Sequence, residues 1–144
     1  MSLLTFSRTV QIAIYAMVYL TLNKNNRNNV SGISEKLNVS KTYLAKTVQT
    51  LSSKKRLKTT TGRMGGIYLN INPKSIKVID IVEAIKGPSK DQDLCALGIG
   101  ECNDDTHCPI HHSWKSIKNT INKKSSNQNL ETLSLELAKK MKNE

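Results

Sequence analysis

Three cysteines and one histidine lie within 17 consecutive residues of this 144-residue chain. They are Cys95, Cys102, Cys108 and His111, in the pattern C-x6-C-x5-C-x2-H, and the chain has no other cysteine. Thiolates and an imidazole are ligands that suit zinc or an iron–sulfur cluster. The spacing therefore predicts a metal or cluster site on one loop, with the neighbouring His107 and His112 as alternatives to His111.

The segment around these ligands contains few apolar residues and several glycines, so a bound metal or cluster would have to supply its order. It contains five acids and no Lys or Arg between Lys90 and Lys115. Acidic neighbours raise the pKa of a thiol, which disfavours a free reactive thiolate, whereas a bound metal deprotonates the thiol. We therefore expect ligation, with a thiol redox switch or inert structural cysteines as the alternatives. The acids are Asp91, Asp93, Glu101, Asp104 and Asp105.

Positive charge is concentrated in the first half of the chain. Residues 1–77 carry 13 Lys and Arg against the single acid Glu35, whereas residues 78–144 carry 9 Lys against 10 acids. A basic field on one part of a protein is expected of a phosphate-binding surface, so the predicted partner is a nucleic acid. The alternative is a basic surface without a particular partner.

The length indicates one domain, or one small domain with an added helical arm. An odd number of clustered cysteines argues against a secreted disulfide framework. No signal peptide is apparent, and the apolar run from Val10 to Leu22 is too short to span a bilayer. We expect a cytoplasmic protein without a membrane partner. No paired carboxylates, nucleophile elbow or phosphate-cradling loop indicates an enzyme.

The first half has the pattern of a winged helix-turn-helix. An almost wholly apolar helix is expected from Ser7 to Leu22, covered on its second side by a partner subunit or by the C-terminal helix. A short helix ending near Asn38 follows, and Ser40 caps a second one. The inner face of this second helix is predicted to hold Tyr43, Leu44, Val48 and Leu51. Residues 56–60 and 67–69 are expected to form the two strands of a β-hairpin wing.

The N-terminal part of the second helix is predicted to enter the major groove of DNA. It offers Ser40, Lys41, Thr42, Tyr43 and Lys46 for contacts with phosphates or base edges, although Tyr43 could instead pack in the core. The turn of the wing adds Gly62, Arg63, Gly65 and Gly66. At the tip, Arg63 could enter a narrow minor groove, or it could be an ordinary surface arginine.

The second half is predicted to hold three helices and the cysteine loop. The first begins at Ser75 or Lys77 and ends at Gly87, and the loop covers residues 89–112. A helix over residues 113–123 follows. Polar residues 125–129 separate it from a last helix over residues 130–141. The predicted domains are residues 1–87 for DNA binding, 88–112 for the cluster loop, and 113–144 for dimerisation and the C-terminal helix.

A domain of this size reads half a site, so a homodimer on a pseudo-palindromic promoter is expected. The apolar first helix and the stripe of Trp114, Ile117 and Ile121 are the candidate dimer surfaces, with intrachain packing as their alternative use.

These segments together resemble the IscR/NsrR/CymR family of bacterial winged-helix regulators. The resemblance rests on the recognition helix Ser40–Leu51, the wing Gly62–Gly66, the D-I-V-E-A-I-x-G helix Asp80–Gly87 and the cysteine loop Cys95–His111. It covers about residues 3–125, and it implies a mostly α fold with a small β-hairpin, in which a winged helix-turn-helix domain precedes a dimerisation helix that crosses between subunits. Many relatives place five residues between the first two cysteines, where this chain has six.

The resemblance also implies that the three cysteines hold an iron–sulfur cluster whose state controls DNA affinity. IscR-like members use a histidine at the position of His111, and NsrR-like members use an acid from the partner's first helix. Because this chain has no acid before Glu35, a 2Fe–2S cluster on Cys95, Cys102, Cys108 and His111 is favoured, with 4Fe–4S or zinc as alternatives. The predicted function is a redox-, nitric oxide- or iron-sensing transcriptional repressor. The alternative is a winged-helix regulator with a structural zinc site or a thiol switch.

Overall fold

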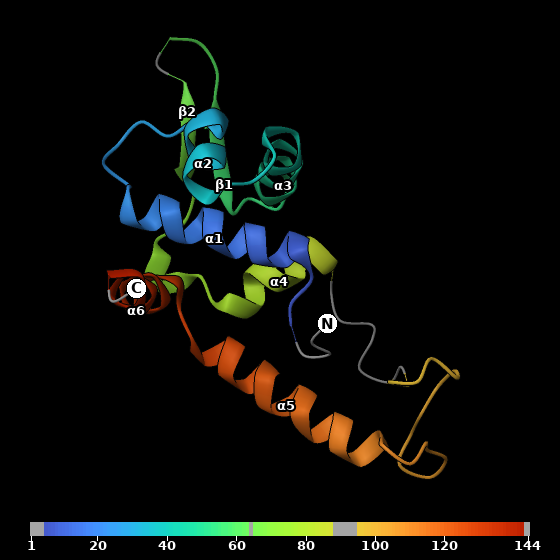
Figure 1. Cartoon of the computed structure of the whole chain (residues 1–144). Coiled ribbons are helices and arrows are strands. Elements are labelled where there is room, and N and C mark those ends of the chain that lie inside the picture. Colours follow the sequence, from blue (N-terminus) through green and yellow to red (C-terminus); the bar gives the residue numbers. More distant parts are fainter. Residues whose placement is uncertain (1–4, 64, 88–94, 143–144) are drawn as a thin grey trace.

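The computed structural model describes residues 5–63, 65–87 and 95–142. This part of the chain is mostly α-helical with one two-stranded antiparallel sheet (Figure 1), as predicted. None of its helices has the length and apolar character needed to cross a membrane. The elements are α1 (Arg8–Leu22), α2 (Val30–Leu37), α3 (Lys41–Ser53), β1 (Leu57–Thr60), β2 (Gly66–Leu69), the 3-10 helix η1 (Pro73–Ser75), α4 (Val78–Lys86), α5 (His111–Asn127) and α6 (Leu130–Lys142).

Local caps position the helix-turn-helix formed by α2 and α3. The side chain of Asn29 accepts a hydrogen bond from the backbone N–H of Gly32 at 2.7 Å, which begins α2. Asn38 takes a left-handed conformation with φ of 51° and ends α2 in a tight turn. Ser40 then caps α3 by accepting from the N–H of Tyr43 at 3.4 Å. The predicted cap of the recognition helix is thus confirmed.

The wing is the antiparallel pair of β1 and β2, with Leu57 opposite Leu69 and Thr60 opposite Gly66. Leu57 and Ile67 are buried against the helical core, while the rest of β1 is exposed. One face of the hairpin is therefore anchored and the turn is left free to extend from the molecule.

The helix α1 lies at the centre of the fold and is buried on several sides. It packs against α6 and α4 on one side and against α2, α3 and β2 on the other. The expectation that a second element covers this apolar helix is confirmed, and α6 of the same chain supplies that cover. Its buried residues are Val10, Ile12, Ala13, Ile14, Ala16, Met17, Val18 and Leu20.

Backbone pairing attaches the C-terminal helices to the core. Val78 N–H donates to the Gln128 carbonyl at 3.0 Å, and Leu130 N–H donates to the Ile76 carbonyl at 2.8 Å. These bonds lie on the two sides of the junction between α5 and α6, so they fix where α6 begins. The completely buried Leu130 then joins the main core.

The observed α5 is longer than the predicted helix over residues 113–123. It begins at His111 and continues to Asn127, so most of the polar stretch expected to separate two helices is helical. Serine and asparagine disfavour a helix only weakly, and Ser125 is buried, so packing overrides the weak local preference. Figure 1 shows α5 extending away from the core. Its residues Ile117 and Ile121 are each 38% exposed.

Candidate metal centre and nucleic-acid interface

The predicted DNA-contacting residues of α3 lie on its accessible surface. Ser40, Lys41, Thr42 and Lys46 are all exposed. Tyr43 is 39% exposed, so its placement on the inner face was wrong. The fully buried Leu44 takes the inner position instead. Tyr43 precedes it and therefore points about 100° away around the helix axis. The hydroxyl of Tyr43 hydrogen-bonds to the hydroxyl of Thr9, which joins the start of α3 to the start of α1.

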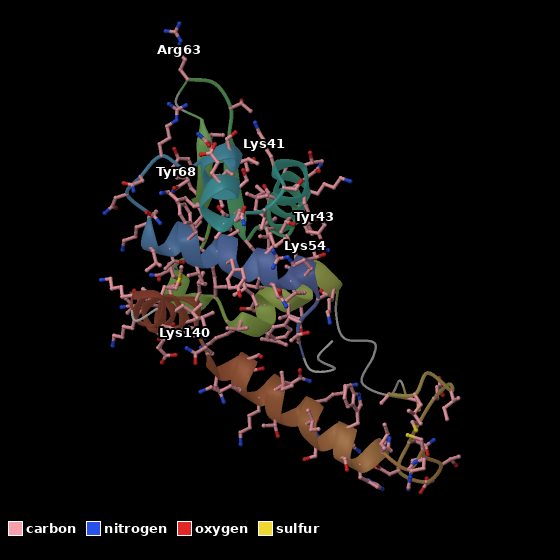
Figure 2. The ribbon with its side chains drawn as sticks, viewed as in Figure 1. Lys41, Tyr43, Lys54, Arg63, Tyr68 and Lys140 are labelled. Carbon is pink, nitrogen blue, oxygen red and sulfur yellow. The ribbon has the colours of Figure 1, made fainter. Side chains whose placement is uncertain are left out.

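The tip of the wing presents Arg63, which points away from the rest of the molecule (Figure 2). Two glycines shape this turn for different reasons. Gly62 has a φ of 90°, and a Cβ atom on Gly65 would lie 2.5 Å from the Thr60 carbonyl oxygen. Gly66, a further predicted contact, is buried in β2, where its backbone pairs with Thr60. The glycines therefore form the turn, and Arg63 is the group that is free to reach a partner.

Arg27 contacts the turn of the wing, which the sequence did not indicate. Its Nε donates to the Gly65 carbonyl at 2.8 Å, and its Nη2 donates to the Gly62 carbonyl at 3.5 Å. The neighbouring Asn28 carbonyl accepts from the N–H of Ile67 at 2.8 Å. The loop between α1 and α2 thereby holds the turn of the wing and the start of β2, and it adds a positive charge beside them. Nothing in the local sequence indicates a contact between residues 38 positions apart.

The three cysteines come together as predicted. The sulfur atoms of Cys95, Cys102 and Cys108 all lie within 4.8 Å of one another. Their residues are 9%, 5% and 6% exposed, and they form a buried cluster separate from the main core in the described part of the chain. Residues 88–94 of the predicted loop lie outside the described residues.

Backbone N–H groups point at two of the sulfurs. Leu97 N–H donates to Cys95 Sγ at 3.4 Å, and this bond is the largest cause that lowers the pKa of the Cys95 thiol. Cys108 N–H donates to Cys102 Sγ at 3.2 Å. For Cys102 this bond favours the thiolate, but burial and the two neighbouring thiols outweigh it, and the pKa of Cys102 is raised. Three crowded thiols with N–H donors suit a bound cation, which would neutralise their combined charge.

His111, the predicted fourth ligand, does not lie within the group formed by the three cysteine sulfurs (the sulfur group). It is the first residue of α5, and its Nε2 lies 3.2 Å from the Asp104 carboxylate. Ligand atoms of Asp104, His111 and His112 form a second group within 4.8 Å of one another. Lys115 binds both oxygens of Asp104 at 2.9 Å, and together with His111 it holds the pKa of that carboxyl below its usual value. The sequence indicated the ligand types but not this division into two groups.

The donor set of the sulfur group fits a thiophilic metal. Three converging thiols leave one further position for a tetrahedral zinc or for the fourth ligand of an iron–sulfur cluster. The described loop buries no other side chain between Cys95 and Ile110, so ligation would supply most of its order. Figure 1 places this loop at the far end of α5 from the wing, so the loop is distant from the predicted DNA-contacting residues.

A winged helix-turn-helix with three clustered thiols on a separate arm has the architecture of a DNA-binding transcription regulator. Residues 6–136 match the family model described as Rrf2, iron-dependent transcriptional regulator. The chain belongs to this family, and its function is therefore DNA-binding transcription regulation rather than catalysis.

Two relatives are each named "Putative HTH-type transcriptional regulator". The one from Aquifex aeolicus is 31% identical over 118 residues, or 81% of each chain. The other, YffB from Lactococcus lactis, is 30% identical over 123 residues, or 82% of this chain and 79% of the relative.

Solved structures share the fold at lower sequence identity. CymR, the global cysteine regulator of B. subtilis, matches with a TM-score of 0.73 and 22% identity over 92% of this chain and 97% of its own. IscR of T. potens matches with a TM-score of 0.71 and 23% identity over 90% of this chain and 86% of its own. The predicted winged-helix fold is confirmed.

Replacing Lys41 with alanine should weaken binding to all DNA sequences by a similar factor. Each lost phosphate contact should reduce the slope of log K against log salt by about 0.9. The matched control is Lys140→Ala, which removes the same charge from α6, away from the wing (Figure 2). Fluorescence anisotropy at several salt concentrations measures both slopes. An unchanged slope for Lys41→Ala would remove this residue from the interface.

Proposed function

We propose that the protein is a homodimeric transcriptional repressor whose promoter affinity depends on a 2Fe–2S cluster held by Cys95, Cys102, Cys108 and His111. The observation that carries this proposal is the convergence of the three sulfurs within 4.8 Å in a loop with almost no other buried side chain. The iron-dependent description of the family supports iron over zinc as the metal.

His111 is proposed as the fourth ligand because it follows Cys108 in the same turn. Its backbone N–H donates to the Cys108 carbonyl at 3.1 Å, so both side chains start from one short segment. To bind the cluster, the imidazole would exchange its contact with Asp104 for a bond to iron. A histidine ligand is neutral where a cysteine ligand is anionic, and it raises the reduction potential of a cluster.

The exposed face of α5 supports the homodimer. Ile117 and Ile121 lie one turn apart, each is 38% exposed, and α5 packs only on α4 among the described elements with substantial contacts. A second copy of α5 would cover this stripe by a two-fold contact. Two winged domains would then be spaced to read the two halves of a pseudo-palindromic site.

A continuous set of packed elements connects the thiols to the recognition helix. The loop leads into α5, which continues into α6, and α6 packs against α1. The start of α1 is hydrogen-bonded to the start of α3 through Thr9 and Tyr43. When bound, the cluster supplies an inorganic group whose integrity responds to oxidants, nitric oxide and iron supply. The ligated cysteines would hold the start of α5, and their release would alter the spacing of the two recognition helices.

Cluster-loaded protein should bind its own promoter with a different affinity from cluster-free protein. A misplaced half-site disfavours specific binding by about 4 kcal/mol or more and leaves the non-specific phosphate attraction intact. Gel shifts with promoter DNA and with unrelated DNA of equal length separate the two effects. The Cys102→Ala variant should behave as cluster-free protein, and Asp105→Ala in the same loop should behave as wild type. Equal affinity of the loaded and cluster-free forms would contradict the proposed control.

Absorption spectra test the assignment of His111. The His111→Ala variant should lose or shift the visible bands of the anaerobically isolated protein, because one iron would change its ligand. The His112→Ala variant is the matched control and should retain the wild-type spectrum. The reverse pattern would transfer the ligand role to His112.

A further inference from the structure

We propose that Asp104, His107, His111 and His112 form a second metal site, distinct from the cysteines, that binds a borderline divalent cation such as Zn²⁺ in cluster-free protein. The four residues lie at the end of the loop and the beginning of α5. Imidazole nitrogens and one carboxylate oxygen are ligands that zinc accepts in tetrahedral sites.

Two pairs of these ligand atoms have the separation expected around one tetrahedral ion. The Nε2 atoms of His107 and His112 are 3.3 Å apart, and Nε2 of His111 is 3.2 Å from Oδ1 of Asp104. Two ligands at zinc–nitrogen distances of about 2.05 Å in tetrahedral geometry are themselves about 3.3 Å apart. The ligand atoms of Asp104, His111 and His112 also lie within 4.8 Å of one another. His107 lies outside this group of three but next to His112. An approach of the three atoms by up to about 1.5 Å, with His107 moving in beside His112, would complete the site.

The tautomer of His107 is the one that a metal ligand needs. Its Nδ1 lies 3.2 Å from the Cys108 carbonyl oxygen, which can only accept a hydrogen bond. In a neutral ring the proton is therefore on Nδ1, and the lone pair of Nε2 faces His112. A histidine that donates its second nitrogen to a backbone carbonyl is the usual arrangement around a protein-bound metal.

The surroundings of the other ligands also suit a cation. The side chain of His111 is only 12% exposed, which limits competition from water. Lys115 binds the Asp104 carboxylate at 2.9 Å. A carboxylate has about four lone-pair positions, so it can accept from Lys115 and still donate a pair to a metal. Lys115 would then orient the carboxylate rather than block it.

The two metal sites share His111, and this part of the inference rests on the proposed function. An imidazole nitrogen can ligate one metal at a time, so zinc in the histidine site would withdraw His111 from the cluster. Zinc should therefore slow cluster assembly in wild-type protein. Zinc should slow assembly less in a His107→Ala/His112→Ala variant than in wild type, because only competition at the three thiols remains and neither histidine is a proposed cluster ligand.

Titration of the full-length chain in which Cys95, Cys102 and Cys108 are all replaced by serine tests the site directly. We expect about one equivalent of Zn²⁺ to bind, and a further His107→Ala or His112→Ala substitution to weaken binding by about tenfold or more. The matched carboxylate pair is Asp104→Asn, which should weaken binding, and Asp105→Asn, which should not. Absence of binding to the folded triple variant, or binding unaffected by the histidine substitutions, would overturn the proposal.

Cobalt distinguishes the two sites if the triple variant does not fold, as judged by circular dichroism. In cluster-free protein with intact cysteines, Co²⁺ at the histidine site should give visible bands that His112→Ala removes, whereas Co²⁺ on thiolates should give an additional sulfur charge-transfer band. A charge-transfer band alone would overturn the proposal. Failure of the histidine site would leave the cluster spectrum of the untreated protein unchanged, so the two proposals fail separately.

Discussion

The order of the cysteine loop depends on its three sulfurs. Between Cys95 and Ile110, no other side chain of the described chain is buried. An apolar core usually offsets the conformational entropy of a folded segment, but here the only buried material is three thiols that approach within 4.8 Å. Two of them accept backbone N–H bonds, and burial together with the neighbouring thiols raises the pKa of Cys102. This combination favours a bound cation, which would supply the missing order and remove the electrostatic conflict.

The helix α1 lies between the C-terminal helices that follow the cysteine loop and the winged helix-turn-helix. It is covered by α6 and α4, and it covers α2, α3 and β2 in turn. The hydrogen bond between the hydroxyls of Thr9 and Tyr43 joins its first turn to the first turn of the recognition helix. Interior packing is dense, so a shift of α5 or α6 would be passed on through α1 rather than absorbed. This packing is the route by which the proposed cluster would act on the distant wing.

Much of the fold could be predicted because its signals are local. Ser40 as a cap, Asn38 as a helix end and the paired strands of the wing all depend on residues within a few positions of each other. The convergence of the cysteines was also indicated, since the ligand types and spacing are themselves local.

The other contacts depend on tertiary packing or on side-chain rotamers. Arg27 holds a turn 38 residues away, and His111 faces Asp104 instead of the sulfurs. Tyr43 and Leu44 are both apolar enough for a core, and only the rotation of α3 against α1 decides which one is buried. Helix propensity alone would end α5 before Ser125. In the structure Ser125 is buried by packing and the helix extends to Asn127.

We propose that Cys95, Cys102 and Cys108 together hold iron and sulfide. Elemental analysis of protein isolated without exposure to oxygen measures this most directly. The account predicts about two iron atoms and two acid-labile sulfides per chain, with both lost in the Cys102→Ala variant. Zinc in a colourless protein without sulfide, or the absence of any transition metal, would contradict it.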